Sequence, residues 1–162
     1  MLSVLDQVRR HKVLAVQAVR NVSTWSRLEP RERALANEIV MGVLRHRLYL
    51  DRALAGVTRD LPRKDPRLMD ILRIGAYQIL RLDGVPDHAS VDSTVGLVRR
   101  IKGPRIAGFV NGALRSLADT RDAVIAEAAT WPATDRHSIL EWLLEELRGA
   151  VSAMVEPLPR LE

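Results

Sequence analysis

An all-α fold of about six to eight helices is predicted by the composition and by the spacing of apolar residues. Apolar residues make up 47% of the 162-residue chain, whereas aromatic residues make up only 4%. Leu, Ala and Val dominate the apolar fraction, which favours an aliphatic helical core over a sheet of β-branched and aromatic residues. No segment shows the strict alternation expected of a strand. A chain of this length can close such a core without disulfides.

The first element is expected to be one amphipathic helix over residues 3–24. Its apolar residues recur at spacings of four and seven, which places them on one face. His11 falls close to that face, so we interpret it as a core or boundary residue. The residues of the stripe are Val4, Val8, Ala15, Val19 and Val22.

Proline, glycine and aspartate mark the limits of the later helices. Pro30 suits a first helical turn, and Asp87 suits the N-cap of the helix that follows it. Gly103 and Pro104 terminate that helix, and Gly75 suggests a close helix crossing. The expected helices after the first cover residues 31–47, 48–57, 67–82, 88–101, 105–117, 121–129 and 136–150.

The charge is distributed unevenly along the chain. Residues 1–118 carry 21 Lys and Arg against 11 Asp and Glu, whereas residues 119–162 carry 4 against 9. A basic excess on one part of a chain is typical of proteins that bind a phosphate backbone. A solvated basic surface is the simpler alternative. We therefore expect a basic domain over 1–118 and a helical linker or tail over 119–162.

The sequence offers no catalytic, metal or cofactor constellation. Cysteine is absent, which excludes thiolate ligands and cysteine nucleophiles. The four histidines are scattered, and no glycine-rich loop follows a strand. Catalytic residues, metal ligands and cofactors are accordingly predicted to be none. The chain also lacks an apolar run of membrane-spanning length, so we expect no membrane partner and a cytoplasmic location.

Two stretches are difficult to explain by helix stability alone. Arg9-Arg10-His11-Lys12 places cations near the start of the expected first helix, where they oppose its dipole. Phe109-Val110-Asn111-Gly112 places Asn and Gly inside an apolar helix, at roughly 1 kcal/mol of unfavourable propensity. Both features indicate a packing or contact role.

These stretches resemble the NusB transcription-antitermination family. Residues 9–12 with 15–19 resemble its opening helix, and residues 108–115 resemble its late-helix signature. Residues 40–47, 50–51, 72–80 and 85–92 are most similar to the amino-terminal domain of RsmB (Sun/Fmu)-type ribosomal RNA cytosine-C5 methyltransferases. The resemblance covers about residues 9–117, and continues weakly through His137, Glu141, Trp142 and Leu143.

The resemblance implies a NusB-like bundle that binds RNA. It implies that Arg9, Arg10 and Lys12 contact phosphates, and that Lys102, Arg105 and Phe109 form the neighbouring RNA-facing surface. An aromatic side chain there can stack on an unpaired base, although Phe109 fits a core position equally well. Asn111 and Gly112 are interpreted first as structural residues.

The methyltransferase half of the resembling enzymes has no counterpart in this sequence. Without cysteine, the covalent mechanism of that family is not possible in this chain. We therefore expect a non-catalytic module that recognises ribosomal RNA and positions a methyltransferase domain outside the chain, where S-adenosylmethionine would bind. Two alternatives stay open. One is a free-standing antitermination or ribosome-biogenesis factor with a ribosomal protein partner, and the other is a protein-binding helical scaffold.

Overall fold

The computed structural model describes residues 1–59, 65–141, 143, 145 and 147. Within these residues the chain forms helices and connecting turns, with no strand, which confirms the all-α prediction. The helices are α1 (Leu2–His11), α2 (Ala15–Asn21), α3 (Pro30–Arg45), α4 (Arg47–Ala55), α5 (Pro66–Arg81), α6 (Asp87–Lys102), α7 (Pro104–Asp119), α8 (Arg121–Ala128) and α9 (Ala133–His137). None of these helices is both long and apolar enough to cross a lipid bilayer.

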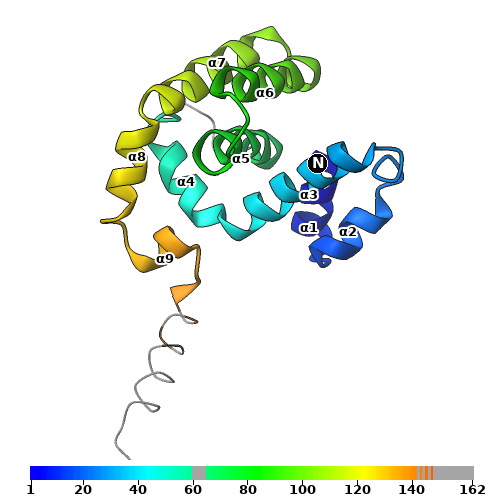
Figure 1. The fold of residues 1–162 in the computed structure, drawn as a ribbon, viewed down its shortest axis with the longest axis horizontal. Helices are drawn as coiled ribbons and strands as arrows, with labels where there is room; N and C mark the ends of the chain where they lie inside the picture. Colours follow the sequence, from blue (N-terminus) through cyan, green and yellow to red (C-terminus); the bar gives the residue numbers. More distant parts are fainter. Residues whose placement is uncertain (60–64, 142, 144, 146, 148–162) are drawn as a thin grey trace, which may run out of the picture.

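Helix α5 is the centre of the bundle. It contacts α1, α3, α4, α6, α7 and α8, and every residue from 70 to 80 is buried. Figure 1 shows α5 nearly end-on, with the α6–α7 pair on one side and α1 to α4 on the other. A helix that is covered on all sides must be apolar around its circumference. The polar residues that α5 does bury, Asp70, Arg73 and Gln78, therefore need partners.

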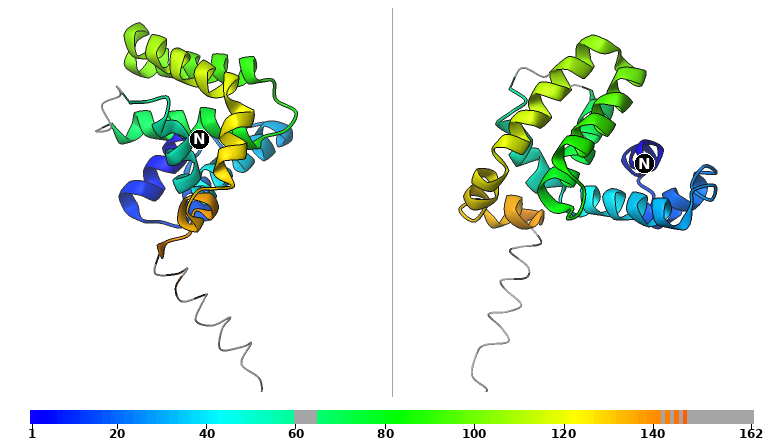
Figure 2. Two further views of the ribbon diagram at one scale, coloured as in Figure 1. Left: turned by 90° about the vertical axis from the view of Figure 1, so that its left-hand side faces the viewer. Right: turned by 45° about the horizontal axis from the view of Figure 1, so that its top comes forward.

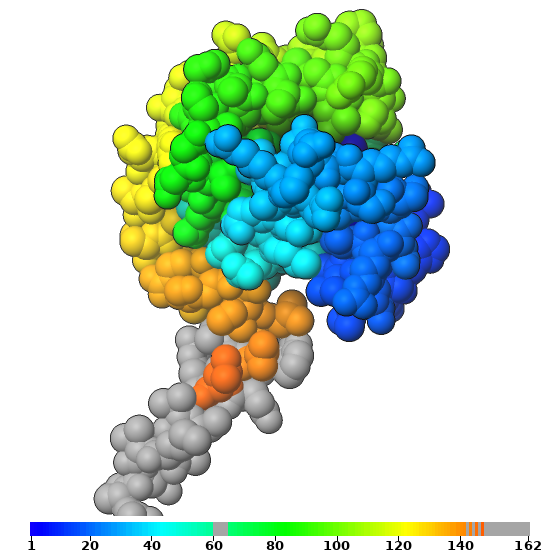
Figure 3. All heavy atoms as spheres, turned by 45° about the vertical axis from the view of Figure 1, so that its right-hand side comes forward, coloured from blue at the N-terminus to red at the C-terminus, as the bar shows by residue number. Residues whose placement is uncertain are grey.

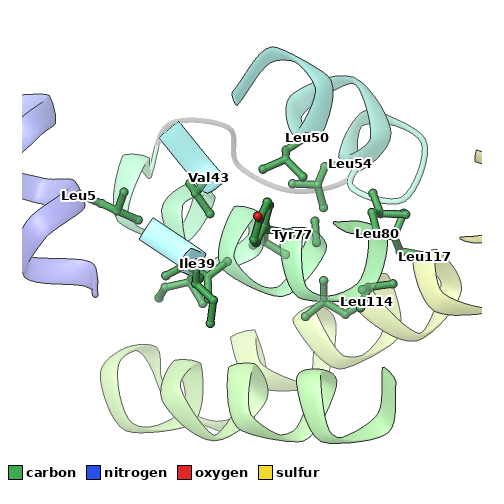
Figure 4. Packing of buried hydrophobic residues seen from close by; sticks show 14 of the residues in the cluster. Leu5, Ile39, Val43, Leu50, Leu54, Tyr77, Leu80, Leu114 and Leu117 are labelled. Atoms are coloured by element: carbon green, nitrogen blue, oxygen red, sulfur yellow. The ribbon is translucent and has the colours of Figure 1, made fainter. Parts of the chain in front are cut away.

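The core is aliphatic, as expected, and is organised around α5. Figure 4 shows Leu50 and Leu54 of α4 on one side of α5, and Leu114 and Leu117 of α7 on another. Two glycines allow neighbouring elements to approach closely. A Cβ on Gly75 would lie 2.7 Å from Leu114 Cδ1, and a Cβ on Gly42 would clash with the hydroxyl end of the Tyr77 ring. The close crossing predicted at Gly75 is confirmed.

The prediction of a single helix over residues 3–24 is wrong. Helix α1 ends at His11, Lys12 takes a left-handed conformation (φ 51°), and its N–H bonds the Val8 carbonyl. Helix α2 then begins at Ala15 and packs back against α1. This reversal lets both halves of the apolar stripe bury residues in one core, which a straight helix of that length would not allow. It also leaves His11 exposed, contrary to the expected boundary position.

Two later helix starts also differ from expectation. Pro86, not Asp87, is the residue that precedes α6, and no side chain caps that helix. The Asp87 carboxylate instead lies 3.5 Å from Arg121 Nη1, at the start of α8. The helix expected over 136–150 is replaced at its start by the short α9, which ends before Ser138 in a left-handed conformation. Residues 142, 144, 146 and 148–150 of that range lie outside the described residues.

Helix α9 is attached to α4 by specific contacts. The Ser138 hydroxyl accepts a 3.1 Å hydrogen bond from the Tyr49 backbone N–H, and Arg52 pairs with Asp135 at 3.3 Å. Trp131, just before α9, is buried with its ring centroid 5.1 Å from that of Tyr49. The two views of Figure 2 show α8 descending from the α6–α7 pair to α9. The helices after α7 are therefore docked onto the bundle.

Candidate nucleic-acid interface

The six residues predicted to face RNA occupy two places on the bundle. Arg9, Arg10 and Lys12 lie at the end of α1, not near the start of a longer helix. Lys102, Arg105 and Phe109 lie at the turn between α6 and α7. The cations of the first group thus lie at a helix C-terminus. Positive charge is favourable there, so helix stability is enough to explain their position.

Asp6 holds both arginines of α1. Its carboxylate accepts a 2.9 Å hydrogen bond from Arg10 Nε and also pairs with Arg9 Nη2. Arg9 Nε reaches across to Asp70 of α5 at 3.3 Å. The Arg9 side chain is only 25% exposed, whereas that of Arg10 is 59% exposed. Arg10 and the exposed Lys12 therefore present charge to solvent, while Arg9 is held between two carboxylates.

The ion pairs continue into the bundle. Asp70 accepts a 2.8 Å hydrogen bond from Arg73 Nη1, and Arg73 donates two more to Asp51 of α4, at 2.7 and 3.0 Å. Burial by itself would lower the pKa of the Arg73 guanidinium, but its hydrogen bonds and charge interactions with Asp51 and Asp70 raise that pKa. The network thus joins α1, α5 and α4.

The second group is also anchored to α5. Lys102 Nζ lies 2.6 Å from Asp65 Oδ2, and the same carboxylate caps α5 by accepting hydrogen bonds from the backbone N–H groups of Arg67 and Leu68. The hydrogen bond from Lys102 is the main cause of the lowered pKa of Asp65. Arg105 is exposed on the first turn of α7. Lys102 therefore stabilises the start of α5 as well as carrying surface charge.

The structure brings the two groups to neighbouring parts of α5 without merging them. Asp65 and Asp70 are five residues apart, which corresponds to about 7.5 Å along a helix and about 140° around it. Arg9 and Lys102 consequently approach α5 from different sides, as the separate positions of α1 and the α6–α7 pair in Figure 1 illustrate.

The face of α7 that carries Arg105 also carries two glycines. Gly108 and Gly112 are exposed, and a Cβ added at either would meet no atom within 4 Å. The structural role expected for Gly112 is therefore not supported by packing, because nothing would obstruct a side chain there. Phe109 is partly buried and packs against the core, so its ring is shared between core and surface.

Sequence reasoning missed the acidic partners of the predicted cations. Asp6 stands three and four residues before Arg9 and Arg10, a spacing that signals helical ion pairs and could have been used. Asp70 is 61 residues from Arg9, and no local pattern connects the two. Among the described residues, no group of three or more His, Asp or Glu side chains is arranged to hold a metal ion.

The profile of the NusB family matches residues 2–119. The chain belongs to the NusB family. The family on which the expectation of RNA binding rested is thereby established.

Its relatives include enzymes that are much longer than this NusB-family chain. It is 35% identical over 150 residues to ribosomal RNA small subunit methyltransferase B of Xanthomonas campestris, a match that covers 92% of the chain and 31% of that enzyme. The enzyme of the same name from Thermus thermophilus is 38% identical over 148 residues, covering 90% of the chain and 32% of the enzyme. The chain therefore spans about a third of the length of these relatives.

Proposed function

We propose that this chain is an RNA-binding helical module that recognises ribosomal RNA and positions an rRNA cytosine-C5 methyltransferase domain. The observation that carries the proposal is the pattern of coverage. Nine-tenths of the chain aligns with methyltransferase B relatives, while the aligned part is only about a third of each enzyme. In this proposal the chain itself is non-catalytic, and S-adenosylmethionine would bind outside it.

The charges that support RNA binding are those that the fold leaves accessible. Arg10 and Lys12 at the end of α1, and Arg105 on α7, are exposed. Lys and Arg side chains in such positions neutralise phosphates and release counterions, which makes affinity fall steeply with salt. The exposed glycines beside Arg105 allow a backbone to approach α7 closely.

The test is fluorescence anisotropy of the chain with labelled fragments of small-subunit ribosomal RNA, at several salt concentrations. We expect a linear decrease of log affinity with log salt, and tighter binding to one ribosomal fragment than to unrelated RNA of equal length. Salt-independent binding, or no binding, would contradict the proposal. A coding sequence that ends at Glu162, with no methyltransferase domain beyond it, would contradict the positioning role.

The same measurement distinguishes the proposed function from the alternative one. If the chain binds RNA only after a ribosomal protein has been added, it acts as a free-standing antitermination or ribosome-biogenesis factor. A binding curve that a stoichiometric ribosomal protein leaves unchanged favours the methyltransferase module.

A further inference from the structure

A groove on the bundle, away from the six predicted residues, is lined by arginines from three helices that are distant in sequence. Arg81 ends α5, Arg121 begins α8, and Arg136 belongs to α9. The hollow has a volume of about 490 Å³, and among its lining residues Asp83 is the acidic one. Figure 3 shows α8 in yellow next to α9 in orange on the surface. The tertiary structure thus gathers positive charge that no sequence motif predicted.

The arginines are held in place by contacts that leave their charge largely uncompensated. The Arg81 guanidinium lies over the Tyr49 ring, 4.2 Å from its centroid, and Tyr49 also packs against the buried Trp131. Arg136 donates a 2.8 Å hydrogen bond to the Ala129 carbonyl. A guanidinium that rests on an aromatic ring or a neutral carbonyl keeps its full charge and has donors left for a ligand.

The carboxylate of Asp87 forms only a weak ion pair with an arginine of the groove. Arg121 Nη1 is 3.5 Å from Asp87 Oδ1, at the outer limit of a hydrogen bond. The groove therefore keeps an excess of positive charge, with three arginines against Asp83 among its lining residues.

We propose that the groove between Arg81, Arg121 and Arg136 binds consecutive phosphates of an RNA backbone. This rests on the proposed RNA-binding function and adds a second contact surface to it. Arginine suits this ligand because its planar guanidinium donates two parallel hydrogen bonds to a phosphate. The groove lies beside α9, the last helix among the described residues, so RNA held there passes along the carboxyl-terminal side of the bundle.

The groove can be tested directly with inorganic pyrophosphate, independently of RNA. We expect titration of the isotope-labelled chain to shift the Nε–Hε resonances of Arg81 and Arg136, whereas those of Arg31 and Arg33 at the start of α3 stay in place. Arg81→Gln with Arg136→Gln should weaken pyrophosphate binding at least about tenfold, since each arginine contributes charge-assisted hydrogen bonds. Equal shifts at all arginines, or none at the groove, would overturn the proposal.

The RNA measurement then separates this site from the function as a whole. The double variant should reduce the salt slope of single-stranded RNA binding by about 0.7 for each arginine removed. Arg27→Gln with Arg31→Gln, which removes two exposed charges elsewhere, is the matched control. If the wild type binds RNA and the groove variant has the same salt slope, the groove proposal is wrong and the RNA-binding function stands. Absence of wild-type RNA binding, with pyrophosphate still bound, refutes the RNA function.

One further variant and two further measurements guard against misinterpretation. Arg81→Lys keeps the charge but loses the planar fork, so it should retain most of the salt slope while weakening pyrophosphate binding. Unchanged helical content in circular dichroism shows that the groove variants fold. A poly-glutamate peptide that displaces poly-U RNA from the groove and binds more tightly than the RNA would assign the groove to an acidic protein segment, and the proposal would be wrong.

Discussion

Arg73 donates a 2.8 Å hydrogen bond to Asp70 one turn earlier on α5, and both side chains are more than nine-tenths buried. Asp70 also receives Arg9 from α1, and Arg73 also reaches Asp51 of α4. A buried ion pair contributes little net stability when complete, but it costs much to break because one charge is left unpaired. The pair therefore makes the attachment of α1 and α4 depend on α5.

Asp70→Asn should lower the free energy of unfolding by about 3 kcal/mol. The substitution preserves shape but removes the negative charge between Arg73 and Arg9, so Arg73 is left with the more exposed Asp51 alone. Urea denaturation followed by circular dichroism measures the change.

Asp6→Asn is the matched control for Asp70→Asn. It removes the partner of Arg9 and Arg10 at a more exposed position, where an ion pair contributes at most about 1 kcal/mol. Similar losses in the two variants would contradict the buried role assigned to Asp70.

Gly75→Ala and Gly112→Ala should have opposite effects, although both replace a helical glycine. A Cβ at Gly75 would lie 2.7 Å from Leu114 Cδ1, so we expect destabilisation by about 1–3 kcal/mol from overpacking. A Cβ at Gly112 meets nothing within 4 Å, and alanine there should stabilise α7 by up to about 1 kcal/mol. Thermal melts of the two variants give the comparison, and a loss of stability in Gly112→Ala would show that the exposed face of α7 is covered.

Arg9→Gln and Arg10→Gln should separate structure from RNA contact. Arg10 is 59% exposed, so its loss should reduce the salt slope of single-stranded RNA binding by about 0.7 and change stability by less than about 0.5 kcal/mol. Arg9 is bound to Asp6 and Asp70, so its loss should lower stability by about 1 kcal/mol with a smaller change in slope. An equal decrease of the salt slope in both variants would show that Arg9 also contacts RNA.

Stability should decrease as the pH falls below about 6.5, the usual value for histidine, partly because of His46. Its pKa is lowered in the folded protein by burial and by Arg81 and Arg45. The unfolded chain therefore takes up a proton on His46 before the folded chain does, and protonation favours unfolding. Denaturation midpoints measured from pH 7.5 to pH 5 should fall less in His46→Gln than in the wild type. Parallel curves would show that His46 does not sense these charges.

Local sequence patterns predicted most of the helices because helix formation depends on neighbours within a few residues. The starts and ends of α3, α5, α6, α7 and α8 fall within two residues of expectation, since proline, glycine and apolar periodicity act at that range. The same periodicity continues through Lys12, so it could not reveal that this residue turns left-handed. Only the packing of α2 against α1 decides that turn.

The sequence by itself determined the basic character of residues 1–118, the absence of cysteine and the helical class. Each of these depends on composition or on short-range spacing. Which cations are accessible was decided by the tertiary structure. Arg9 meets Asp70 across 61 residues, and Arg81 and Arg136 share a groove across 55. Long-range neighbours are set by how helices pack, and a charge acts as a binding group or as a structural one according to the neighbour that packing supplies.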